Sequence, residues 1–229
     1  MYKEHITDIF FDLDHTLWDF EKNSELTFDK ILKLNAIDIS LSDFLRVYVP
    51  NNLLFWKMFR EEKISKSELR YQRLKTTFDA LNYQVQDDVI NKLAEDYIDN
   101  LSSFNYLFPN AIDILDYLKP NYKLHIITNG FKEVQNKKIE NSNIADYFVH
   151  VIDSEMAGVK KPNPVIFKLA LDKAGVLPEN ALMIGDSFEA DILGAKACGM
   201  SALHFNAHNE KRHDICNMII DLNEIKEYL

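Results

Sequence analysis

Short apolar runs alternate with polar loops and amphipathic stretches through the second half of the chain. One run, residues 6–11, lies near the amino terminus, and four more follow at 122–127, 148–152, 181–185 and 201–205. Their length and continuity are typical of buried strands. Helices are predicted at about 109–119, 132–141, 163–174 and 188–198, and the tail 215–229 should add a short strand and a final helix. This repetition indicates an α/β fold with a parallel sheet and helices on both faces.

The segment from residue 17 to residue 104 has a different pattern. The first 129 residues contain no glycine, and Pro50 is the one proline between Leu17 and Tyr106. Further helices are predicted at 23–36 and 42–60, and Ser65 and Glu68 have capping-box spacing at the start of another. The clearest helical stripe comprises Val89, Ile90, Leu93, Ala94, Tyr97, Ile98 and Leu101. We therefore predict a helical bundle, residues 17–104, inserted into a core domain of residues 1–16 and 105–229.

Two carboxylates, those of Asp12 and Asp14, directly follow the first apolar run. Alternate residues of a strand point to the same side, so both acids are expected to face one spot. Such a pair is costly unless a positive group lies between the acids or their chemistry requires the arrangement. A divalent metal and a phosphate are the ligands that the pattern favours. Taken alone, the pair could also be a polar turn without function.

Other predicted strands also end in polar groups. Thr128-Asn129-Gly130 follows the second strand, and Gly185-Asp186-Ser187, with Asp191 beyond it, follows the fourth. A nearby loop supplies a lysine, either Lys161 or its neighbour Lys160. The carboxyl ends of parallel strands lie at one edge of a sheet, so these groups are expected to meet there. Each motif alone could be a capping turn.

Together the four motifs closely resemble those of the haloacid dehalogenase-like (HAD) hydrolase superfamily. Asp12-Leu13-Asp14-His15-Thr16 matches the first motif, Thr128 the second, Lys161 the third, and Gly185-Asp186-Ser187 with Asp191 the fourth. The resemblance covers essentially the whole chain, because residues 17–104 have the size and helical character of the family's inserted cap. It implies a Rossmann-like core with a helical cap. His15 departs from the glycine often seen at that position, although no catalytic group is lost.

The resemblance implies phosphoryl transfer through an aspartyl-phosphate. Asp12 would be the nucleophile, and Asp14 the general acid and then the base that activates water. Burial and a neighbouring carboxylate are expected to suit Asp14 to proton transfer. Thr128, Asn129 and Lys161 would bind the phosphoryl oxygens of the substrate.

The cofactor implied by the resemblance is Mg²⁺, which prefers oxygen ligands. Its ligands would be the Asp12 carboxylate, the Asp14 backbone carbonyl and Asp186. Asp191 would orient Lys161 or a metal-bound water. The partner of such a site is a small phosphorylated metabolite.

A finer resemblance concerns the substrate. A helical cap directly after the first motif is similar to subfamily I, and residues 12–20, 127–131, 185–192 and 206–208 are similar to its noncanonical pyrimidine nucleotidase branch. The substrate implied is a nucleoside 5′-monophosphate. Aromatic rings and arginines at 55–60 and 70–73 would suit a base or sugar, although a bundle core and its solvated face contain the same residue types.

Other activities stay open. A sugar-phosphate phosphatase or phosphomutase would use the same groups, the mutase returning phosphate to its substrate. A 2-haloacid dehalogenase shares the fold and nucleophile but needs no second acid, so Asp14 counts against it. An inactive scaffold is disfavoured by the intact set of acids, threonine and lysine. His204 and His208 have no cysteine or acid at zinc-ligand spacing, so we expect packing roles for them.

Composition narrows the class of protein further. The 229 residues are 47% hydrophobic and 27% charged, as in globular domains, and the net charge of −10 argues against binding polymeric nucleic acid. No apolar stretch approaches the roughly 20 residues that span a bilayer, and the first strand leaves no room for a signal peptide. Two cysteines make no disulfide framework. We expect a cytoplasmic protein without a membrane partner, either a monomer or a homodimer.

Overall fold

The computed structural model describes residues 2–229 and divides the chain into two compact units. Unit 1 combines the segment that ends at Phe20 with Asn105–Leu229, and unit 2 is Glu21–Phe104. Residues 17–20, which the sequence pattern assigns to the cap, therefore belong to unit 1. The physical reason is that residues 17–18 pair with residues 107–108, which belong to that unit. Trp18 bridges Leu107 in antiparallel fashion, and the N–H of Phe108 donates to the carbonyl of Leu17.

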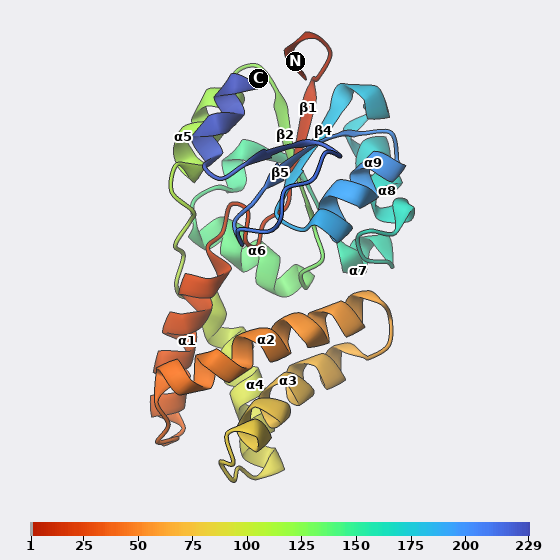
Figure 1. Cartoon of the computed structure of the whole chain (residues 1–229). Coiled ribbons are helices and arrows are strands. Elements are labelled where there is room, and N and C mark those ends of the chain that lie inside the picture. Colours follow the sequence, from red (N-terminus) through yellow and green to blue (C-terminus); the bar gives the residue numbers. More distant parts are fainter. Residues whose placement is uncertain (1) are drawn as a thin grey trace. The chain divides into compact units, whose positions relative to one another are not determined.

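Unit 1 is built on a parallel sheet of order β3-β2-β1-β4-β5-β6 (Figure 1). Its strands are β1 (Asp8–Phe11), β2 (Lys123–Thr128), β3 (Phe148–Asp153), β4 (Ala181–Gly185), β5 (Ser201–Phe205) and β6 (Asn217–Ile219). β1 lies between β2 and β4, so Phe11 is level with Ile126 on one side and Ile184 on the other. β2 and β3 lie on one side of β1, and β4, β5 and β6 lie on the other. Folds of this kind bind ligands at the carboxyl ends of the strands where the order reverses.

Helices cover both faces of this sheet (Figure 1). They are α5 (Ala111–Leu118), α6 (Lys132–Asn141), α7 (Ser154–Ala157), α8 (Pro164–Ala174) and α9 (Gly194–Ala197). α8 and α9 pack on one face in a buried cluster with Phe10, Ile127 and Met183. α5 lies on the other face with the C-terminal segment Leu222–Glu227. The predicted Rossmann-like core is therefore confirmed.

The helix predicted at 23–36 begins earlier, at Phe20, and three predicted helices of unit 1 also differ from the structure in their start or type. The helix expected from Pro109 begins at Ala111, because Asn110 before it is left-handed with φ 65°. The helix expected over 188–198 starts as a π-helical segment, Phe188–Leu193, before α9. In that segment the N–H of Ile192 donates to the carbonyl of Ser187. The expected final helix is a 3₁₀ segment.

Unit 2 is helical throughout, as predicted. Its helices are α1 (Phe20–Leu34), which begins at the last residue of unit 1, α2 (Leu41–Arg60), α3 (Lys66–Ala80) and α4 (Asp87–Leu101). The capping box opens α3: Ser65 Oγ accepts from the Glu68 N–H, and the Glu68 carboxylate accepts from the Ser65 N–H. Aromatic rings fill the centre of the bundle, where Phe28 contacts both Tyr48 and Tyr97 at centroid distances of 4.4 and 4.7 Å.

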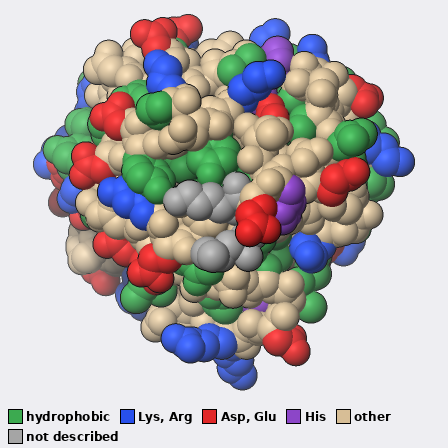
Figure 2. All heavy atoms as spheres, turned by 90° about the horizontal axis from the view of Figure 1, so that it is seen from above, with side chains coloured by type: hydrophobic (Ala, Val, Ile, Leu, Met, Phe, Trp, Pro, Cys, Tyr) green, Lys and Arg blue, Asp and Glu red, His purple; other side chains and the backbone are tan. Residues whose placement is uncertain are grey.

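Charged side chains are distributed over the surface. On the face shown in Figure 2, acidic and basic side chains are interspersed with polar and apolar ones. The acidic excess of the chain, −10 in all, is therefore not gathered into one patch on that face. Among residues 2–229, every helix is too short or too polar to cross a membrane.

Candidate active site

Lys161 lies at the centre of a polar cluster at the carboxyl ends of β1, β2 and β4. Its side chain is 2% exposed. The ammonium lies 2.6 Å from Asp12 Oδ1, 2.6 Å from the Ile127 carbonyl and 2.7 Å from Asp191 Oδ1. The ammonium donates to Asp12 and to the Ile127 carbonyl and forms an ion pair with Asp191, which together fix its position. Lys161, rather than the alternative Lys160, is therefore the lysine of this cluster.

Burial and charge act in opposite directions on these groups. Burial raises the pKa of Asp12 well above its usual range, and Asp191 and Asp186 raise it further, against the lowering effect of Lys161. Burial disfavours the Lys161 ammonium, but the attraction of Asp12 and Asp191 outweighs it and raises the pKa of Lys161. Burial likewise raises the pKa of Asp191. The acids therefore require more positive charge than one lysine provides.

Two local features hold Lys161 and Asp191 in place. The amide of Asn129 accepts from the Lys161 N–H at 2.7 Å and donates to the Lys161 carbonyl at 3.0 Å. Asn129, which is expected among the substrate ligands, thus also holds the backbone of Lys161 by both ends of its amide. Gly185 allows Asp191 to approach the backbone, because a Cβ at residue 185 would lie 2.4 Å from Asp191 Oδ2. That oxygen accepts from the Ser187 N–H.

Thr128 presents a hydroxyl at the end of β2. Its Oγ1 accepts from the Gly130 N–H at 3.1 Å and from Gln135 Nε2 at 2.7 Å. A hydroxyl has two acceptor positions and one proton. Both acceptor positions are used, so the proton is left to donate to an oxygen of a bound group. A phosphoryl oxygen, the partner expected for Thr128, is such a group.

Asp14 is held by two residues that the sequence motifs do not include. Its Oδ1 lies 2.6 Å from the Lys138 ammonium, and its Oδ2 accepts from Gln135 Nε2 at 2.9 Å. Both residues belong to α6, on the face that also buries Val134 and Ile139. The sequence feature that could have revealed them is the presence of two polar residues on the apolar stripe of a helix. The Asp14 side chain is 21% exposed, rather than buried beside a second carboxylate as expected.

The donor set and the charge of the cluster both fit Mg²⁺. Oxygens of Asp12, Asp186 and Asp191 lie within 4.8 Å of one another, and hard oxygen ligands are those that Mg²⁺ prefers. Both oxygens of Asp191 are engaged, Oδ1 by Lys161 and Oδ2 by the Ser187 N–H, whereas Lys161 contacts one oxygen of Asp12. Asp12 and Asp186 are therefore the better carboxylates to hold an ion. With Asp14, four carboxylates meet two lysine ammonium groups, before any charge on neighbouring histidines is counted. A divalent cation would neutralise the excess.

Two histidines contact Asp186, and sequence reasoning missed both contacts because the histidines lie outside the motifs. The buried His204 lies 2.8 Å from the Asp186 carbonyl and must donate through Nε2, since a carbonyl only accepts. His208 Nε2 lies 3.3 Å from Asp186 Oδ2. Burial alone would raise the pKa of Asp186, but His208, His15 and Lys161 outweigh it and lower the pKa. An ionised Asp186 suits a metal ligand.

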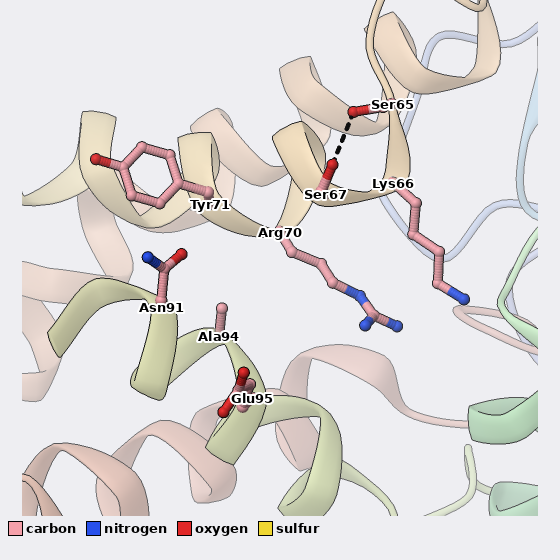
Figure 3. Close-up of a pocket in the computed structure, with 8 residues that line it drawn as sticks. All are labelled: Ser65, Lys66, Ser67, Arg70, Tyr71, Asn91, Ala94 and Glu95. Carbon is pink, nitrogen blue, oxygen red and sulfur yellow. Dashed lines mark hydrogen bonds between the residues drawn. The ribbon is translucent and has the colours of Figure 1, made fainter. Parts of the chain in front are cut away.

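Unit 2 has a pocket of its own, of about 520 Å³, between α4 and the start of α3. It is lined by Ser65, Lys66, Ser67, Arg70, Tyr71, Asn91, Ala94 and Glu95. Figure 3 shows the long side chains of Lys66 and Arg70 extending from the first turns of α3. Tyr71 Oη donates to Asp87 at 2.7 Å. Arg70 and Tyr71, which the sequence suggests for contact with a base or sugar, therefore line a pocket.

A family model described as haloacid dehalogenase-like hydrolase matches residues 8–199. The matched span contains all four motifs and most of the chain. The chain belongs to the haloacid dehalogenase-like hydrolase family. The resemblance found in the motifs is thereby confirmed, and with it the prediction of an enzyme.

Relatives of this HAD hydrolase include a nucleotidase and a sugar-phosphate phosphatase, and the family together with these relatives supports a phosphatase of the HAD type. It is 32% identical to pyrimidine 5′-nucleotidase YjjG of Escherichia coli (strain K12), over 89% of this chain and 88% of the relative. It is 30% identical to the glyceraldehyde 3-phosphate phosphatase of Methanothermobacter thermautotrophicus, over 96% of this chain and 98% of the relative. The crystal structure of the magnesium-bound HAD-hydrolase YfnB from Bacillus subtilis matches with a TM-score of 0.89 and 24% identity, covering 98% of this chain and 99% of that one, which shows the shared fold.

Proposed function

We propose that the chain is a Mg²⁺-dependent phosphomonoester hydrolase that forms an aspartyl-phosphate on Asp12 and acts on nucleoside 5′-monophosphates. The observation that carries the proposal is the buried Lys161 ammonium between Asp12 and Asp191. A fixed positive charge beside a carboxylate nucleophile offsets its repulsion of an anionic phosphate. In this proposal unit 1 supplies the chemistry, and unit 2 is the cap that selects the substrate.

The first half of the reaction transfers the phosphoryl group to Asp12. A carboxylate oxygen of Asp12 attacks phosphorus, the bond from phosphorus to the leaving oxygen breaks, and Asp14 protonates the leaving alkoxide. Thr128 donates its proton to a non-bridging oxygen, and Lys161 adds its charge there. When bound by Asp12, Asp186 and the Asp14 carbonyl, Mg²⁺ supplies further charge neutralisation at the phosphate.

The second half of the reaction restores Asp12. Asp14, now a carboxylate, takes a proton from water, and the water oxygen attacks the phosphorus of the aspartyl-phosphate. The bond between phosphorus and Asp12 breaks, and inorganic phosphate leaves. The Asp14 side chain is 21% exposed, so water can reach it.

The similarity to pyrimidine 5′-nucleotidase YjjG supports a nucleoside 5′-monophosphate as substrate. A sugar or triose phosphate is the second candidate, because a glyceraldehyde 3-phosphate phosphatase is 30% identical over 96% of the chain. The two candidates share the chemistry of unit 1 and differ in the leaving group. Side chains of the unit 2 pocket, Arg70 and Tyr71 among them, are our candidates for the residues that set the choice between the two substrates.

Measurement of released phosphate tests both parts of the proposal. Protein stripped with a chelator should be inactive and recover with Mg²⁺, and nucleoside 5′-monophosphates should give a higher kcat/KM than sugar phosphates. Asp12→Asn keeps the shape of the side chain but removes the attacking charge, so turnover should fall by roughly a thousandfold or more. Mass spectrometry of acid-quenched wild-type protein should find one phosphoryl group on the peptide that contains Asp12.

Asp146→Asn is the matched control, because it makes the same change at an exposed position of unit 1. It should match the wild type in turnover. A folded Asp12→Asn variant with normal turnover would show that Asp12 is not the nucleophile. A preference for sugar phosphates would keep the mechanism and favour the second candidate substrate.

A further inference from the structure

Lys138 is a buried lysine that the four motifs do not explain. Its side chain is 2% exposed, although lysine is among the residue types least often buried. Its ammonium lies 2.6 Å from Asp14 Oδ1, 4.3 Å from the centre of the Trp18 ring and 5.4 Å from that of Phe20. Removing an ammonium from water is costly, and a carboxylate and two aromatic faces offset that cost here. The fold thus places a fixed positive charge against Asp14.

Gln135 holds the other oxygen of Asp14. It is 1% exposed, and its Nε2 donates both to Asp14 Oδ2 at 2.9 Å and to Thr128 Oγ1 at 2.7 Å. The reverse orientation of the amide would place Oε1 against the Asp14 carboxylate, so this orientation is the favourable one. One amide therefore links the acid to the hydroxyl that would bind phosphate.

Burying the Gln135 amide in this position costs free energy. Gln135 Oε1 is buried and has no hydrogen-bond partner among residues 2–229, a penalty that an apolar side chain would avoid. Gly130 leaves room for this amide, because a Cβ at residue 130 would lie 2.3 Å from Gln135 Cδ and would displace it. Packing alone does not explain a buried acceptor without a hydrogen bond next to a glycine that leaves room for the amide.

We propose that Lys138 and Gln135 are positioning residues that fix the Asp14 carboxylate for proton transfer. This inference rests on the proposed function, since it takes Asp14 as the acid and base. Two donors from one helix, α6, bind the two carboxylate oxygens and so fix the carboxylate relative to Thr128. A structural ion pair between α6 and the loop after β1 would use the same contacts, but its loss would affect all substrates alike.

The leaving group separates these two explanations. A nucleoside 5′-monophosphate releases a basic alkoxide that needs a proton, whereas p-nitrophenyl phosphate releases a stable phenolate that does not. Lys138→Met keeps the side-chain length and removes the charge. Its kcat/KM on the nucleotide should fall about a hundredfold, which is the order of magnitude that general acid catalysis contributes. On p-nitrophenyl phosphate its kcat/KM should fall only about tenfold.

Hydrolysis of the aspartyl-phosphate gives a second readout, because this step is common to both substrates. Slower proton abstraction from water should let the phosphoenzyme accumulate in Lys138→Met, which would appear as a burst of p-nitrophenolate. Gln135→Met should behave in the same way and replaces Lys138→Met should that variant not fold. Lys138→Arg, which keeps a cation, should recover most of the nucleotide activity. Lys137→Met, the same change at an exposed neighbour on α6, should match the wild type.

The activity of Asp14→Asn on the two substrates is the reference for these variants. If Asp14→Asn loses activity equally on both substrates, Asp14 is not the acid, and the proposed function itself fails. If it depends on the leaving group but folded Lys138→Met and Gln135→Met variants do not, the positioning role is overturned and the proposed function stands.

Discussion

Asp191 lies so close to the backbone of Gly185 that a side chain at residue 185 has no room. A Cβ there would lie 2.4 Å from Asp191 Oδ2 and 2.5 Å from its Cγ. The carboxylate would have to turn away, and it would then lose the N–H of Ser187 and the ammonium of Lys161. The absence of a side chain at residue 185 thus lets Asp191 hold the lysine that faces Asp12.

Gly185→Ala should therefore impair catalysis through Asp191. Displacement of a catalytic group by about 1 Å can cost roughly a hundredfold in rate, and we expect a loss of that order in kcat. Steady-state phosphate release from Gly185→Ala, Asp191→Ala and the double variant gives a double-mutant cycle. Because both changes act on the same contact, the double variant should be little worse than the poorer single one. Additive losses would show that Gly185 acts on another part of the site.

Residues at the ends of strands could be predicted from the sequence, because parallel strands bring their carboxyl ends to one edge. Asp12 and Asp186, which follow β1 and β4, therefore lie close together although they are far apart in the sequence. Lys138 and Gln135 could not be predicted in this way, because they lie inside α6 rather than at its start. Their positions on the apolar stripe were visible, but only the packed structure shows that the stripe faces Asp14.

At the scale of elements, the bounds of β4, β5 and α6 agree with prediction, because their apolar patterns are clear over their whole length. The π-helical segment Phe188–Leu193 could not be predicted. A π turn adds one residue to an α turn, and the pattern of apolar positions changes too little to reveal it. The start of α3 could be predicted, because its capping box can be recognised in the sequence.

Ser65→Ala tests how much this capping box stabilises the fold. The substitution removes the oxygen that accepts from the Glu68 N–H at the start of α3. The free energy of unfolding should fall by about 1 kcal/mol, the typical value of such a cap, as measured by urea denaturation followed by circular dichroism. Ser67→Ala removes the hydrogen bond between the Ser67 and Ser65 hydroxyls but keeps both contacts of the capping box, so as the control it should cost less. Equal losses in the two variants would mean that the cap adds nothing beyond an ordinary surface serine.

At the scale of the whole molecule, a buried histidine ties stability to pH. His125 on β2 is fully buried, and its Nε2 lies 2.9 Å from Asp8 Oδ1. Its Nδ1 has no hydrogen-bond partner within the described part of the chain, so a proton there would have no acceptor. Burial lowers the pKa of His125, with help from the nearby His150 and Lys123, although Asp8 raises it. The folded protein therefore favours the neutral ring, with Nε2–H donating to Asp8.

Unfolding exposes His125 to water, where its pKa returns toward about 6.5. As the pH falls through that value, the unfolded chain binds a proton that the folded protein resists, so the free energy of unfolding decreases until the folded ring titrates as well. His125→Gln can still donate to Asp8 but cannot titrate. Its free energy of unfolding should fall less steeply below about pH 6.5, by at most about 1.4 kcal/mol per pH unit for one proton. Urea denaturation at several pH values measures the slope, with His5→Gln, an exposed histidine of unit 1, as the control that keeps the wild-type slope. An unchanged slope in His125→Gln would mean that the folded ring takes up a proton as readily as the unfolded one, which would make its contact with Asp8 an ion pair.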